Sequence, residues 1–328
     1  MTARHRAQGA ARDRHPAQGA ARALAAGELR RVLARRMVKV MALLAVAGIA
    51  LAGILTYVNT EDVSPAEIAA RRADAEARVA ACEAGQVPTV EGRQFEGAPP
   101  PGSPARKQFC GFAAGRVEDD RFKLRSLKGI LQGTTAPLIV VAWVIGASVI
   151  GSDWQSRTIT TVLTWEPRRA RVLLTKAFAC VVVASVFAVL AQALLSAALL
   201  PSAYLHGTTD GTGGDWLRSV FGVLLRGTGL VAIAAAVGFS VASIGRNTAA
   251  ALGIGFAYFL VIENVVGSFL EDFRRWLILG NAIVLVSGED SGGEVIGRSV
   301  LVAALYLTAV GIGLLAVATA LFRRRDVA

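Results

Sequence analysis

The chain has 328 residues, of which 54% are hydrophobic and 18% charged, with a mean hydropathy of +0.50 and a formal net charge of +11. Its apolar residues come in blocks of about 20 with almost no charge, the length that a helix needs to cross ~30 Å of hydrocarbon. This pattern excludes an ordinary soluble protein. Because backbone groups in lipid must be satisfied internally, it predicts an all-α integral membrane fold.

The N-terminal part is basic. Residues 1–27 are rich in Arg, Ala and Gly, and we interpret them as a disordered basic tail, with a lipid-binding arm as the alternative. The next stretch, GELRRVLARR from Gly27 to Arg36, predicts an amphipathic helix with Leu29, Val32 and Leu33 clustered and Arg elsewhere. Such a helix is expected to lie on the inner leaflet and to lead into the first span.

Residues 28–328 are predicted to form one transmembrane domain with six spans. Lys and Arg gather at both termini and between spans two and three, which predicts that these parts are cytoplasmic. The net charge is thus a topology signal, and no nucleic-acid partner is expected. Residues 59–128 then form an extracytoplasmic loop domain. The predicted spans are Val38–Val58, Gly133–Ser152, Ala177–Leu200, Gly227–Ile244, Ala249–Phe269 and Ser299–Phe322.

The outer loop carries two predicted helices, Pro65–Gly85 and Gly115–Gly129, with a stiff linker at Ala98–Ala105. Cys82 and Cys110 share this loop on the side expected to be oxidising. A disulfide between them would close a loop of about 28 residues and contribute about 3–4 kcal/mol. Two free thiols are the alternative.

Charges also occur near the outer ends of later spans. The stretch from Trp216 to Arg226 has a narrow polar stripe, and we expect a separate interfacial helix on the outer face. Arg226 and Glu263 lie within apolar surroundings on neighbouring spans, so they form a candidate ion pair. The alternatives are snorkelling side chains and a polar point on a substrate exit path.

Sequence motifs of enzymes are absent. The chain has no G-x-x-x-x-G-K-[ST], H-E-x-x-H, C-x-x-C or G-x-S-x-G, and its three histidines lie in the tail or an outer loop. We therefore expect no catalytic residue, no metal site and no cofactor in this chain.

One cytoplasmic segment stands out. It runs from Gly151 to Lys176 and reads GSDWQSRTITTVLTWEPRRARVLLTK. Asp153–Trp165 predicts a short helix with its apolar residues mostly on one side, and Pro167 ends that helix. A surface helix with an apolar face suits docking of a soluble partner, whereas a simple connector is the alternative.

This segment resembles the first cytoplasmic loop of ABC-2 type transporter permeases. In that family an acidic residue ends span two, a coupling helix follows, then a Pro-Arg pair, and a Lys enters span three. The resemblance implies that the following residues couple the chain to an ATPase: Asp153, Trp154, Thr158, Thr161, Leu163, Trp165, Glu166, Pro167, Arg168, Arg169 and Lys176.

The resemblance also implies a function. The chain would be the permease subunit of an ATP-driven exporter, forming a homodimer or a heterodimer with a similar permease. A separate soluble ABC ATPase would bind ATP and Mg. Membrane lipid surrounds such a protein, and the Arg-rich, Lys-poor usage suggests the cell membrane of a bacterium. A membrane scaffold or sensor that binds a partner through residues 59–128 is the second hypothesis.

Overall fold

The computed structural model describes residues 26–60, 63–86, 89–90, 93–94, 99–113, 121–165, 168–269, 271–288 and 297–324. The basic tail up to residue 25, and Glu166 and Pro167 of the predicted coupling segment, lie outside these residues. Six helices in the described chain are long and apolar enough to cross a membrane, which confirms the predicted all-α, six-span class. They are Arg36–Asn59, Leu124–Gln155, Arg169–His206, Gly214–Gly245, Thr248–Val265 and Val300–Arg324.

The chain divides into two compact units. The first comprises residues 1–52, 125–198 and 211–328, and the second comprises residues 53–124 and 199–210. Helical residues 26–34 open the described part of the first unit. Two of its helices, α3 (Arg36–Asn59) and α8 (Arg169–Pro201), have C-terminal ends that belong to the second unit. Its other elements are α6 (Leu127–Gln155), α7 (Thr158–Trp165), α9 (Gly214–Gly245), α10 (Thr248–Ala257), the π-helix η3 (Tyr258–Val266), α11 (Gly267–Phe269), the 3₁₀-helix η4 (Glu271–Trp276), α12 (Ile278–Ser287) and α14 (Val300–Arg324).

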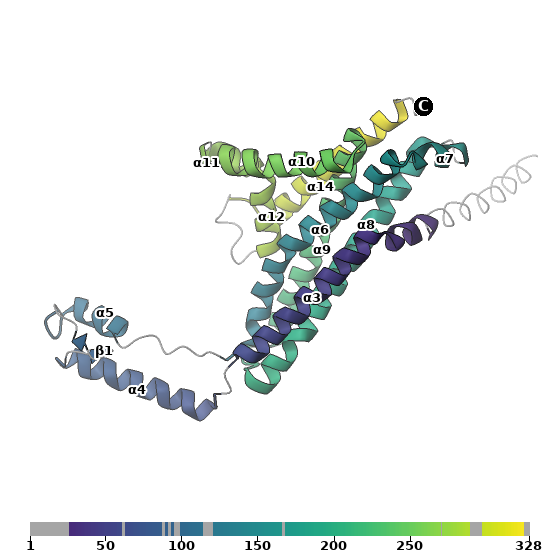
Figure 1. Ribbon diagram of the computed structural model, residues 1–328. Coiled ribbons are helices and arrows are strands. Elements are labelled where there is room, and N and C mark those ends of the chain that lie inside the picture. The colour runs from purple at the N-terminus through teal and green to yellow at the C-terminus, as the bar shows by residue number, and fades with distance from the viewer. Residues whose placement is uncertain are drawn as a thin grey trace, which may run out of the picture. The chain divides into compact units, whose positions relative to one another are not determined.

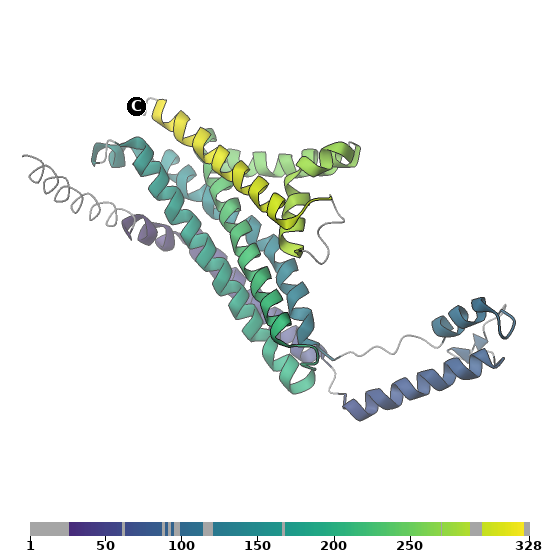
Figure 2. The ribbon, with the colours of Figure 1, turned by 180° about the vertical axis from the view of Figure 1, so that it is seen from behind.

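Helix α9 lies at the centre of this unit, between α6 and α14 (Figures 1 and 2). Small residues allow α6 and α9 to approach closely: Gly146 faces the carbonyl of Ala235, and Gly238 faces the carbonyl of Trp143. Without a hydrophobic force between helices in lipid, such small-residue packing is a main source of association. The core around this contact is apolar and includes Ile145, Val231 and Phe239.

One expectation about the spans was wrong. Trp216–Arg226 is not a separate interfacial helix, because α9 runs without interruption from Gly214 to Gly245. Val220 and Val223 are buried, and no proline breaks the run, so the polar stripe is carried on one long helix. The predicted fifth span is confirmed as an apolar helical run, Thr248–Val265, in which α10 passes into the π-helix η3; the short α11 follows.

The second unit contains α4 (Pro65–Glu83), the antiparallel strands β1 (Thr89–Val90) and β2 (Arg93–Gln94), and α5 (Pro104–Ala113). Ser64 accepts a hydrogen bond from Glu67 N at the start of α4. The helix predicted at Gly115–Gly129 is confirmed only from Leu124 onward, where a 3₁₀ turn (Leu124–Ser126) leads into α6. Phe122 and Lys123 are not helical, because Phe122 O and Leu124 N form backbone hydrogen bonds with Thr208.

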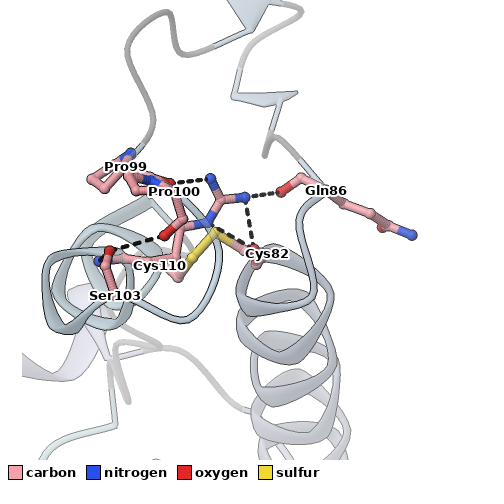
Figure 3. The surroundings of a disulfide bond; sticks show 7 residues. Cys82, Gln86, Pro99, Pro100, Ser103 and Cys110 are labelled. Atoms are coloured by element: carbon pink, nitrogen blue, oxygen red, sulfur yellow. Dashed lines mark hydrogen bonds between the residues drawn. A yellow bond between two sulfur atoms is a disulfide. The ribbon is translucent and has the colours of Figure 1, made fainter.

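A disulfide joins Cys82 at the end of α4 to Cys110 on α5, with their Cα atoms 5.7 Å apart (Figure 3). Next to it, the buried Arg106 donates to the carbonyl oxygens of Cys82 (2.8 and 2.9 Å), Gln86 (3.1 Å) and Pro99 (2.8 Å). Carbonyls at a helix C-terminus carry partial negative charge and lack helical partners. Arg106 thus satisfies the end of α4 while the disulfide links the two helices.

Candidate functional site

The turn between α6 and α7 has unusual backbone geometry. Arg157 adopts a left-handed conformation, with φ of 56°, between the end of α6 at Gln155 and the start of α7 at Thr158. A non-glycine residue in this region costs of order 1–3 kcal/mol unless its surroundings hold it. Here Thr158 Oγ1 donates to Asp153 O at 3.4 Å, and Thr160 Oγ1 donates to Arg157 O at 2.6 Å.

Helix α7 turns its apolar side inward. Ile159 is only 3% exposed and belongs to the core of the first unit, and Leu163 packs against that core. Thr158, Thr161 and Thr164 are exposed. The prediction that α7 offers its apolar face to a partner is therefore wrong for Ile159, because the core buries this side chain, whereas Leu163 is half-buried against the same core. The surface that α7 offers is a row of threonines.

Near this turn lies a cluster of charges, which we call the ion cluster: the buried Glu28, Asp153 and Lys176 and the half-buried Arg35. Lys176 Nζ lies 2.8 Å from Asp153 Oδ2 and 3.0 Å from Glu28 Oε2. Arg35 lies 2.8 Å from Asp153 Oδ1, and it also donates to Ser148 O at 3.0 Å and to Ser152 Oγ. Relative exposure is 3% for Lys176, 4% for Glu28 and 9% for Asp153.

The ion cluster balances two carboxylates with two cations, which is the condition under which buried charges are tolerated. It joins helical residues 26–34, the C-terminal end of α6 and the first turns of α8. Asp153 and Lys176, predicted to contact an ATPase, are thus engaged inside the chain. Glu28 and Arg35 were missed by the sequence reasoning, although Glu28 is the one acid in GELRRVLARR.

A second set of contacts holds the C-terminal end of α6. Trp154 contacts Phe322 edge to face, with centroids 5.9 Å apart, and the Arg246 guanidinium lies 5.0 Å from its ring centre. Gln155 Nε2 donates to Asn247 Oδ1 at 3.1 Å, and the same oxygen caps α10 by accepting from Ala249 N at 2.8 Å. Trp154 therefore acts within the chain, linking α6 to the α9–α10 turn and to α14.

The remaining predicted coupling residues divide by exposure. Thr158, Thr161 and Arg168 are exposed, and Arg169 is half-buried. Trp165 ends α7, and its side chain is outside the description, as are Glu166 and Pro167.

Arg226 and Glu263, the candidate ion pair, are not brought together. Glu263 Oε1 accepts a hydrogen bond from Leu279 N at 2.9 Å, whereas the Arg226 guanidinium lies against Gly288. Elsewhere, no group of three or more His, Cys, Asp or Glu among the described residues could hold a metal ion.

Comparison with known families agrees with this architecture. The family model described as ABC-2 family transporter protein matches residues 22–327. The chain belongs to the ABC-2 transporter family. Among curated proteins, none matches the chain significantly. As a member of this family, the protein is a multi-pass membrane component of an ABC transporter, a class that works with an ABC ATPase and is generally not itself catalytic.

Proposed function

We propose that this ABC-2 permease is the membrane subunit of an exporter driven by a separate ATPase, and that α7 is its coupling helix. One observation carries the proposal: α7 exposes Thr158, Thr161 and Thr164 while the turn at its base is fastened by buried ion pairs. A helix that is exposed on one side and held by ion pairs on the other can pass a movement of a bound partner on to the spans. ATP and Mg would be bound by the partner chain.

The contacts at the base of α7 indicate which spans would move with it. Asp153 connects to Lys176 on α8 and to Arg35 before α3, and Trp154 connects to Phe322 on α14. Movement of α7 would therefore reach several spans together. Closure of two ATPase subunits on ATP could then favour one of two arrangements of the spans, because a partner shifts an equilibrium by its differential contacts.

The proposed setting is the cell membrane of a bacterium, with α7 and both termini in the cytoplasm and a homodimer or heterodimer as the working unit. Arg30, Arg36 and Lys39 are exposed around the start of α3. Basic side chains at this position suit the anionic headgroups of the inner leaflet, each contributing about 1 kcal/mol.

The test is a pull-down of the full chain from native membranes in mild detergent, followed by mass spectrometry. A soluble ATPase with a P-loop is expected with the wild type, and Thr161→Arg should reduce its recovery by at least about tenfold, since loss of one interface hot spot exceeds 1.4 kcal/mol. Ala70→Arg, on an exposed position of α4, is the matched control and should retain the ATPase.

Full recovery of the ATPase by Thr161→Arg would show that α7 is not the docking element. If no ATPase appears and other proteins are retained through the second unit, the scaffold or sensor hypothesis gains support. That hypothesis is favoured by one observation, the separate compact unit closed by its own disulfide. ATP-dependent flux through reconstituted vesicles would exclude it.

A further inference from the structure

Helix α12 differs from the other apolar helices. It has 10 residues, which is about 15 Å of helix and half of what crossing the hydrocarbon requires. Ala282, Leu285 and Val286 are nevertheless buried, in a cluster with Leu230 of α9 and Leu307 of α14. A short helix inside a bundle must satisfy both of its ends there, because unpaired backbone groups away from water are costly.

The N-terminal end of α12 is met by a carboxylate. Its N-cap residue, Leu277, has no side chain that can cap it. Instead Glu263 Oε1, on η3, accepts from Leu279 N at 2.9 Å, and Tyr258 Oη accepts from Ile278 N at 3.4 Å. Glu263 is buried. The negative charge therefore lies where the helix has its partial positive charge.

The C-terminal end of α12 is met by a cation. Gly288 follows the helix with φ of 77°, and the Arg226 guanidinium lies so close that an added Cβ at this glycine would clash with it. Gln132 Nε2 donates to Val286 O at 3.4 Å and to Ser287 O at 3.2 Å. Within the described residues Arg226 has no carboxylate partner, and its buried Nε has no hydrogen bond.

These contacts place a negative charge at the positive end of α12 and a positive charge at its negative end. We propose that Glu263 and Arg226 are positioning residues that act together through the dipole of α12 and hold this helix in the membrane bundle. The pair explains two intramembrane charges that would otherwise be expensive. It also involves η3, a π-helical segment of the kind often found at functional positions.

This arrangement, which we call the clamp, fixes the position of α12. A short helix can shift without withdrawing a span from the membrane, so its position is controlled by what holds its ends. Asn281 adds a local anchor at the N-terminal side, where its Nδ2 donates to Leu277 O at 2.7 Å and its Oδ1 accepts from Arg298 at 3.1 Å. The C-terminal side has Gln132 and Arg226. Loss of Arg226 should therefore free that end first.

The test measures how readily α12 leaves the bundle. Ala282→Cys places a thiol on the buried side of α12, and its reaction with a maleimide is followed in membranes that contain the full chain. Cys82 and Cys110 are joined and Cys180 is buried, so a change in the labelling rate reports exposure of the new thiol at position 282. Glu263→Gln and Arg226→Gln should each raise the labelling rate about 5- to 30-fold, the effect of one well-placed charge at a helix end. Arg226→Lys, which keeps the charge, should stay near the wild type.

The decisive variant exchanges the two charges, Glu263→Arg with Arg226→Glu. The clamp predicts faster labelling than either single neutral variant, because both charges then oppose the dipole. A direct ion pair predicts restoration to the wild-type rate, which would overturn the proposal, as would unchanged labelling in both neutral variants. If the exchanged protein does not accumulate, the neutral variants and Arg226→Lys decide.

A matched control exchanges Asp215 and Arg218, which lie 3.4 Å apart near the start of α9 with side chains 99% and 85% exposed. This swap should leave the labelling rate unchanged. Because no ATPase or nucleotide is needed, the result does not depend on the proposed coupling function of α7.

Discussion

Lys176 shows how a single buried cation can organise one end of a bundle of helices. It contacts Glu28 and Asp153 within 3.0 Å while being almost fully buried. Two carboxylates in one buried site would repel each other without it. The same residue had been expected to face a partner, but burial and pairing make its contribution an internal one: it fixes the geometry at the base of α7.

We expect Lys176→Met to lower stability strongly. The substitution keeps much of the side-chain volume but leaves Glu28 and Asp153 with less compensation, and removing one partner of a buried pair costs about 3–5 kcal/mol. The apparent Tm of the purified chain in detergent measures this. Lys39→Met, at an exposed position of α3, should leave the melting curve unchanged, and Lys176→Arg should recover part of the loss. A Lys176→Met curve that overlays the wild type would contradict this assignment of the ion cluster.

At the scale of elements, the contact between α6 and α9 depends on glycines, which have no side chain to keep the two helices apart. Gly238 and Gly146 bring backbone against backbone, so the two helices meet at a distance that Ala or larger residues would prevent. By contrast, Gly229 of α9 has nothing within 4 Å of an added Cβ. The helix therefore offers an internal comparison.

Gly238→Ala and Gly229→Ala should change stability in opposite directions. A methyl group at Gly238 would press on the carbonyl of Trp143 and cost about 1–3 kcal/mol through overpacking. At Gly229 the same change meets open space and adds up to about 1 kcal/mol through helix propensity. Thermal denaturation of both variants in the same detergent checks this. Equal shifts would mean that close packing of α6 and α9 does not limit stability.

At the scale of the whole molecule, the two compact units differ in the interactions that stabilise them. The second unit has a disulfide and a buried Arg106, and the first has the ion cluster and one buried free cysteine. Disulfides persist in oxidising compartments. This division agrees with the proposed topology, in which residues 59–128 are outside and the termini inside.

An impermeant maleimide can test that topology on intact cells. After mild reduction from outside, we expect labelling of Cys82 and Cys110, whereas buried Cys180 should remain unlabelled. The variant with Ser at both positions 82 and 110 is the control and should lose the signal. Labelling that appears only after the cells are opened would place the second unit in the cytoplasm and reverse the proposed orientation of the spans.

The sequence alone determined the class, the number of spans and the family, because long uncharged blocks have one stable solution in lipid and the Gly151–Lys176 pattern is specific. It also identified Asp153 and Lys176 as notable residues. It could not show that Glu28 and Arg35 complete their cluster, since these residues lie more than 100 positions away. Nor could it show that α7 faces inward with Ile159, because an amphipathic pattern defines a face but not what covers it. Only the tertiary structure showed what Arg226 and Glu263 contact. The short helix α12 lies between the two charges, and a helix dipole cannot be recognised from the identity of the residues.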